Sequence, residues 1–181
     1  MNLHDAQREI RSALLGGFAG QLIAGLIWAL SALLTLLGAP NSGIGVLFFG
    51  SMAIFPLTQG LLHLLGRPAR VSAANGLWPL GMQIAFTVPL NFLLVFAATL
   101  YRADWFYPAA MIVVGAHYLP FITLYGMRMF GLLAGLLVTG GTLLGVLGSP
   151  VMSLGGWATA ATLIVFAFVG RWLVLQEEQG N

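Results

Sequence analysis

The chain has 181 residues, of which 59% are hydrophobic and only 7% are charged. A soluble domain carries about 25% charged residues, so this composition excludes a soluble globular domain, a disordered tail, a coiled coil and a nucleic-acid-binding module. All seven basic residues are arginines and cysteine is absent, which excludes Schiff-base chemistry, disulfides, thiolate metal sites and a cysteine nucleophile. An integral membrane protein remains.

Six apolar stretches are long enough to cross a hydrocarbon core of about 30 Å as helices, which takes about 20 residues. In chain order they cover residues 13–37, 44–65, 77–100, 108–127, 129–148 and 151–175. We therefore predict an all-α polytopic bundle of six transmembrane helices. Only Gly126-Met127-Arg128 separates the fourth stretch from the fifth, so five spans with one long kinked helix is the alternative. The first stretch exceeds the roughly 7–15 residues of a signal-peptide core, and we expect it to be retained.

Arginine placement predicts the orientation of this bundle. With six spans, one side of the membrane holds all but one of the arginines, namely Arg8, Arg11, Arg67, Arg70, Arg128 and Arg171. Only Arg102 lies on the other side. Because cytoplasmic loops are rich in arginine, we expect both termini in the cytoplasm of a cell with the bundle in its inner membrane.

Three segments follow from this topology. Residues 1–12 are expected to form a cytoplasmic or interfacial segment that continues directly into the first span. Residues 13–175 form the six-helix transmembrane domain, and residues 176–181 form a cytoplasmic tail.

Glycine pairs at four-residue spacing mark helix faces that can approach one another closely in lipid. The pairs are Gly16 with Gly20, Gly131 with Gly135, and Gly141 with Gly145. We expect most of them to pack inside the bundle. A homo-oligomer interface is the other use of such faces.

Uncharged polar residues recur at helical spacing and therefore share helix faces. At about 1.5 Å per residue, Gln21, Gln59 and Gln83 lie roughly 10 Å from their cytoplasmic ends and can form one layer. A second layer, about 15–22 Å deep by the same rise, contains Ser51, Asn91 and His117. Unpartnered amides are costly in hydrocarbon, so we expect these faces to point inward and meet. The predicted binding residues are Gln21, Ser51, Gln59, Gln83, Thr87, Asn91, His117 and Tyr118.

None of the five acidic residues lies within a predicted span. Proton relays usually need an intramembrane carboxylate, and metal sites need carboxylates, thiolates or several histidines, so neither is predicted, and we expect no cofactor. An enzyme acting on a lipid would rest only on His117 with Tyr118 or Ser51. Enzymatic activity is therefore not predicted.

Four arginines, namely Arg11, Arg67, Arg128 and Arg171, are predicted to form a cytoplasmic rim. Such a rim can attract an anionic solute or a lipid headgroup. The favoured interpretation is that the rim does no more than set the topology. Both interpretations stay open.

Two functions fit these patterns. The first is a small-molecule transporter or channel-like protein whose polar layers bind a neutral or anionic solute, with membrane lipid as its other partner. The second is a non-catalytic scaffold or accessory subunit that assembles through its glycine faces. In the second case the polar residues are interhelical hydrogen bonds that hold the bundle together.

Four segments stand in order along the chain: REIRSALLGGF at 8–18, GLIW at 25–28, LFFG at 47–50 followed by Pro56-Leu57, and YRADWFYPA at 101–109. This arrangement resembles an uncharacterised family of small bacterial multi-pass membrane proteins, a domain of unknown function. The resemblance covers most of the chain and implies a bacterial inner membrane. It brings no activity and no site residues.

Overall fold

The computed structural model describes residues 1–67 and 70–180. Within them, six helical spans are long and apolar enough to cross a membrane. The spans are Leu15–Leu36, Pro40–Leu64, Trp78–Tyr101, Ala103–Tyr125, Met129–Leu147 and Leu154–Gln179. Six spans are therefore confirmed and the five-span alternative is wrong. Gly126, in a left-handed conformation with φ of 66°, ends the fourth span before the fifth begins.

Proline and glycine define most of the helix boundaries and breaks. The helices are α1 (Leu3–Ala13), α2 (Phe18–Leu36), α3 (Pro40–Leu64), α4 (Trp78–Tyr101), α5 (Phe106–Tyr118), α6 (Phe121–Tyr125), α7 (Met129–Leu147) and α8 (Leu154–Gln179). Two short 3-10 turns, Leu15–Gly17 and Ala103–Trp105, lead into α2 and α5. The fourth span is split into α5 and α6 because Pro120 has no N–H to continue the helical ladder.

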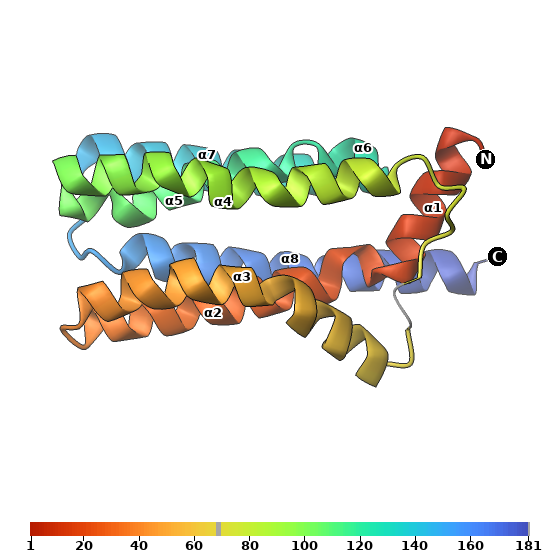
Figure 1. Cartoon of the computed structure of the whole chain (residues 1–181), viewed down its shortest axis with the longest axis horizontal. Helices are drawn as coiled ribbons and strands as arrows, with labels where there is room; N and C mark the ends of the chain where they lie inside the picture. Colours follow the sequence, from red (N-terminus) through yellow and green to blue (C-terminus); the bar gives the residue numbers. More distant parts are fainter. Residues whose placement is uncertain (68–69, 181) are drawn as a thin grey trace.

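The long helices form two layers (Figure 1). Helices α2, α3 and α8 make one layer, and α4, α5, α6 and α7 make the other. Both termini lie at the same end of the bundle, which we call the terminal end; the opposite end is the distal end. The last hairpin is divided between the layers, because α7 packs chiefly on α5 whereas α8 packs chiefly on α2.

Helix α1 does not continue into the first span, and the expectation of a continuous N-terminal segment is wrong. Leu15, Gly16 and Gly17 all have positive φ, at 48°, 62° and 83°, so the chain turns sharply between α1 and α2. A Cβ on Gly16 would lie 2.6 Å from the carbonyl oxygen of Gly170 in α8. Glycine is therefore required at position 16 both for its conformation and for the close approach of the two backbones.

Most of the predicted glycine pairs pack within the bundle, as expected. Gly16 meets Gly170, Gly20 faces Thr58, and both Gly141 and Gly145 contact Pro108. Gly131 contacts Ile122, and only Gly135 of the six faces open space.

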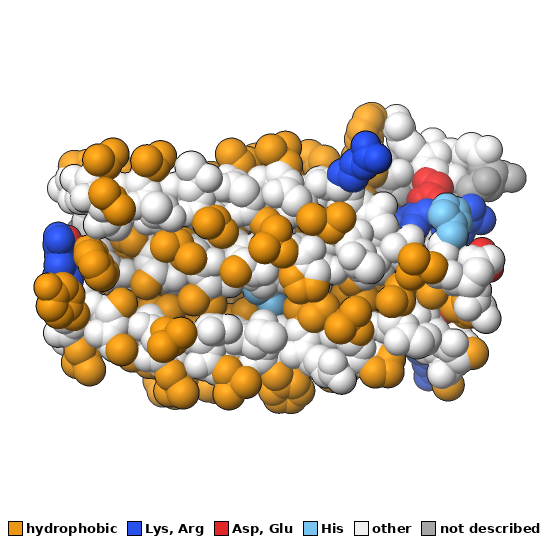
Figure 2. Space-filling model, turned by 90° about the horizontal axis from the view of Figure 1, so that it is seen from above, with side chains coloured by type: hydrophobic (Ala, Val, Ile, Leu, Met, Phe, Trp, Pro, Cys, Tyr) orange, Lys and Arg blue, Asp and Glu red, His pale blue; other side chains and the backbone are white. Residues whose placement is uncertain are grey.

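The surface matches a membrane environment. Figure 2 shows apolar side chains along the length of the bundle and charged side chains gathered toward its two ends. Many exposed large residues of α3 and α4 are apolar, among them Phe49, Phe55, Phe86 and Leu90. His63, Gln83 and Asn91 are exposed polar residues on the same helices. The protein is thus a membrane-compatible helical bundle.

Candidate functional site

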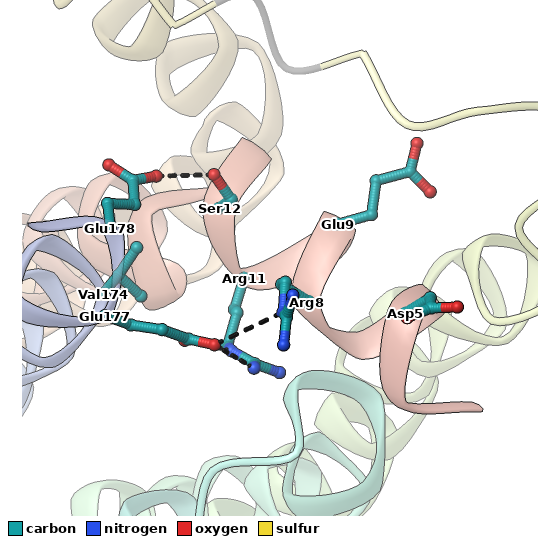
Figure 3. Close-up of a pocket in the computed structure, with 8 residues that line it drawn as sticks. All are labelled: Asp5, Arg8, Glu9, Arg11, Ser12, Val174, Glu177 and Glu178. Atoms are coloured by element: carbon teal, nitrogen blue, oxygen red, sulfur yellow. Dashed lines mark hydrogen bonds and ion pairs between the residues drawn. The ribbon is translucent and has the colours of Figure 1, made fainter. Parts of the chain in front are cut away.

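Helix α1 is held across the terminal end by a two-point ion pair to α8 (Figure 3). Arg11 Nε donates to Glu177 Oε2 at 2.7 Å, and Arg11 Nη2 donates to Glu177 Oε1 at 2.5 Å. Arg8 Nε lies 3.6 Å from the same Glu177 Oε1. Arg11 is only 8% exposed, so this pair is partly withdrawn from water and its planar geometry is well defined.

A second ion pair joins the end of α3 to the end of α8. Arg67 donates to both carboxylate oxygens of Glu178, at 2.7 and 2.5 Å. Ser12 on α1 donates to Glu178 Oε1 at 2.6 Å. The hydrogen bond to Glu178 raises the pKa of the Arg67 guanidinium above its ordinary value.

Helix α1 also reaches the other layer and the connection between α3 and α4. Gln7 Nε2 donates to the carbonyl oxygen of Thr123 in α6 at 2.6 Å. Glu9 accepts hydrogen bonds from the Ser72 backbone N–H at 2.7 Å and from Asn75 Nδ2 at 2.8 Å. These contacts of Gln7, Glu9, Arg11 and Ser12, with those of Arg67, are called the α1 network below. The network ties both layers together at the terminal end.

A cavity of about 340 Å³ lies between α1 and the end of α8. Figure 3 shows the side chains that line it. They are Asp5, Arg8, Glu9, Arg11, Ser12, Val174, Glu177 and Glu178. The cavity is therefore a polar, charged mouth at the terminal end, closed on one side by the α1 network.

Polar and aromatic contacts join the two layers at the distal end. The Tyr107 hydroxyl of α5 lies 2.8 Å from Ser31 Oγ and 2.8 Å from Thr35 Oγ1, both on α2. Phe48 of α3 packs against two rings of α4, with ring centroids 5.9 Å from Phe92 and 5.1 Å from Phe96. Tyr107 is completely buried, so its hydroxyl depends on these partners.

The two predicted polar layers do not pair as expected. Ser51 donates to the Phe48 carbonyl and Asn91 to the Thr87 carbonyl, each within its own helix. Gln59 and Gln83 make no hydrogen bond within the described part of the chain, and Gln83 and Asn91 are exposed. Hydroxyls and short amides find acceptors on their own helix, which removes the need for a partner across the bundle.

Two of the predicted binding residues, Thr87 and His117, lie close together. Thr87 Oγ1 of α4 lies 3.3 Å from His117 Nδ1 of α5. Tyr118 is buried beside it and stacks on Phe130 of α7, with ring centroids 6.0 Å apart. This group lies directly before the break between α5 and α6.

Gln21 is the most unusual of the predicted residues. It is 2% exposed, and neither its side-chain nitrogen nor its side-chain oxygen has a hydrogen-bond partner. Thr58 Oγ1 is likewise buried without a partner. In a membrane-spanning helix such groups are costly, so their presence requires an explanation.

The predicted arginine rim does not form a single feature. Arg11 and Arg67 bind glutamates in the α1 network. Arg171 lies over the ring of Phe18, 5.0 Å from its centroid, and Arg128 is exposed at the start of α7.

The acidic partners Glu177 and Glu178 were missed by the sequence prediction. A signal for them exists, because the segment before the first span carries arginines and the segment after the last span carries adjacent glutamates. Antiparallel packing of an even number of spans brings these segments to one end.

The fold and its polar ends define a multi-pass, membrane-compatible bundle of six spans. The chain belongs to a family of unknown function, DUF7010, whose model matches residues 3–176. This agrees with the resemblance to an uncharacterised family. No curated protein and no solved structure matches the chain.

Proposed function

We propose that the protein is a small-molecule transporter or channel-like protein of the inner membrane, with both termini in the cytoplasm, that passes a neutral or anionic solute between its two helix layers. One observation carries the proposal. The layers are joined by polar contacts at both ends, while buried polar groups between the ends lack partners. A structural bundle gains nothing from an unpaired buried amide such as that of Gln21, whereas a solute pathway uses it.

The contacts at the terminal end suit a gate. An ion pair that water can reach contributes roughly 0–1 kcal/mol, so several of them hold α1 in place yet allow it to open. The Arg11–Glu177 pair is the most buried of them and is the main contact to break. The three successive residues of positive φ at Leu15–Gly17 provide the point about which α1 would turn.

The contacts at the distal end suit a second gate. Each hydroxyl hydrogen bond of Tyr107 contributes about 1 kcal/mol net, a cost that a conformational change can meet.

The interruption at Pro120 gives the fourth span two halves that can move separately, as in the discontinuous helices of known transporter architectures. The solute would then pass Gln21, near the point where α2 of one layer meets Phe130 of the other.

The charge distribution supports passive passage of an uncharged or anionic solute. The acidic residues lie at the ends of the bundle, in the α1 network or beside Arg102. A carboxylate at mid-membrane, the usual group for coupling to protons or cations, is absent from the described spans. The arginines on the terminal side support the cytoplasmic placement of that end.

The alternative, a scaffold assembled through glycine faces, has less support. Five of the six glycines in the predicted pairs are occupied by contacts within the bundle. Of these six, Gly135 faces open space, as do Gly45 and Gly60 of α3 outside the predicted pairs.

A reversible cross-link of α1 tests the proposal. The described chain has no native cysteine, and a Cβ on Gly126 would lie 3.4 Å from Gln7 Cβ, close to the separation of a disulfide. The variant Gln7→Cys with Gly126→Cys is reconstituted in liposomes, and the flux of a panel of small neutral and anionic solutes is followed by stopped-flow light scattering. We expect solute flux in the reduced form, a loss of flux on oxidation and its return on reduction.

The two single-cysteine variants are the matched controls, and oxidation should leave their flux unchanged. Gly126→Cys places a side chain at φ of 66°, so the flux of the double variant is compared with that of this single variant. Wild-type protein that passes no solute above protein-free liposomes would refute the proposal. Full flux through the oxidised double variant would refute α1 as the gate.

A further inference from the structure

We propose that Gln21 is a solute-binding residue and that the group it binds is a carboxamide or urea; this rests on the proposed function. The first argument is the state of its side chain. Gln21 is 2% exposed, and both Nε2 and Oε1 lack partners. An amide can donate twice and accept twice, so the whole capacity of this group is unused.

The second argument is position. Gln21 lies in the first turns of α2, directly after the turn that separates α1 from α2. A Cβ on Gly17 would lie 3.3 Å from Gln21 Nε2 and 3.3 Å from Cζ of Phe130. The amide thus lies close to the point where α2 of one layer meets α7 of the other, behind the α1 network.

A neighbouring group strengthens the argument. Thr58 of α3 faces Gly20, with Oγ1 3.6 Å from the Cβ that Gly20 lacks, and this hydroxyl is also buried without a partner. Two orphaned polar groups therefore border the adjacent positions 20 and 21 of α2. Thr58 borders the α3 side of α2 and Gln21 lies near Phe130 of α7, so the hydroxyl is a second unpaired polar atom beside the same turn of α2.

The chemistry of an amide selects the ligand class. A carboxamide or urea presents a donor and an acceptor side by side and can pair with Gln21 through two hydrogen bonds at once. An anion only accepts and would leave Oε1 unpaired in an apolar setting, at a cost in free energy. The ring of Phe130 beside the amide favours a small neutral solute over a charged one.

Access to this site requires movement, because the polar atoms of Gln21 are enclosed here. The turn at Leu15–Gly17 adjoins Gln21, so a rotation of α1 about that turn would uncover the amide. The closed conformation then carries the cost of the unpaired amide, and the solute removes that cost on binding.

The test compares acetamide and urea with glycerol, which offers hydroxyls only. Proteoliposomes carrying wild type, Gln21→Leu or Gln176→Leu are mixed with each solute, and the rate of swelling is measured by stopped-flow light scattering. Gln176 is exposed beyond the last apolar residue, so its variant is a matched Gln→Leu control. We expect Gln21→Leu to lower the permeability of acetamide and urea, relative to that of glycerol, roughly tenfold, equivalent to about one net hydrogen bond.

Three results would overturn the inference. Unchanged amide permeability in Gln21→Leu removes Gln21 from the site, and an equal loss for all three solutes removes the preference for amides. If the wild-type protein passes glycerol but neither acetamide nor urea, the inference is refuted and the transporter proposal stands. If the wild-type protein passes no solute, both are refuted. Gln21→Met, which keeps an unbranched side chain, replaces the leucine variant if the latter does not fold.

Discussion

Replacing Gln21 with leucine should make the folded protein more stable, although the residue is polar, buried and predicted to be functional. Both polar atoms of the Gln21 side chain are enclosed without partners among the described residues, so the folded protein bears a desolvation cost with no hydrogen bond to offset it. An unsatisfied buried group of this kind costs about 1–3 kcal/mol. Leucine is similar in size and removes that cost without leaving a large cavity.

The expected gain is therefore about 1–3 kcal/mol in the free energy of unfolding. For a chain of this length each kcal/mol corresponds to roughly 2–4 °C in melting temperature. The assay is thermal unfolding in a lipid nanodisc, followed by the fluorescence of tryptophan, since Trp28 is 2% exposed in the core. The same variant should lose amide flux, so stability and transport should change in opposite directions.

A buried polar residue that does make hydrogen bonds, on the same helix as Gln21, provides the comparison. Ser31 is completely buried but donates to the Gly43 carbonyl at 2.7 Å and pairs with the Tyr107 hydroxyl. Ser31→Ala should lower stability by about 1–2 kcal/mol, because it removes two buried hydrogen bonds, although the Tyr107 hydroxyl keeps Thr35 as a partner. If Gln21→Leu destabilises the protein as much as Ser31→Ala does, then the amide makes a hydrogen bond that matters in the closed state and the reasoning fails.

Two further predictions concern the ends and the packing of the bundle. Arg11→Met should weaken the docking of α1 by about 1–2 kcal/mol. This value is reduced because the partner Glu177 is partly exposed to water. A double-mutant cycle with Glu177→Gln that gave strictly additive effects would show that the ion pair contributes nothing. Gly170→Ala should destabilise by about 1–3 kcal/mol, because the added Cβ would lie 2.6 Å from a backbone oxygen of the α1–α2 turn. Gly135→Ala, which faces open space, should be close to neutral by the same unfolding measurement.

The number of spans and the sharing of one end by both termini could be predicted from the sequence, because length and apolar composition dictate them. The break between α6 and α7 was marked only by Gly126, and its left-handed conformation is what makes that single glycine sufficient. The turn before α2 was not predicted, although glycines mark it as well. Gly16 was interpreted as part of a packing face, and it does pack on Gly170, but the same residue also turns the chain.

The candidate site was predicted only in part. The cost of amides in hydrocarbon predicts that Gln21 has a polar partner, whereas the described part of the chain provides none. Helical spacing put Ser51 and Asn91 on polar faces, yet both bond to their own helices, which the spacing cannot reveal. The pairing of Arg11 with Glu177 joins residues 166 positions apart, and only the tertiary packing of α1 against α8 decides it.

The division of the last hairpin between the layers has a consequence for biosynthesis. Helix α2 is among the first parts of the bundle to leave the ribosome, and the surface around Gly25 remains open until Ala160 and Ile164 of α8 arrive to cover it. The layer containing α2 is therefore completed only when the final span is inserted. A nascent chain halted before α8 holds an unfinished layer with exposed glycine faces, which makes it a natural target for membrane proteases and for association with the wrong helices. Assembly of this protein is thus a late, long-range event that the last span controls.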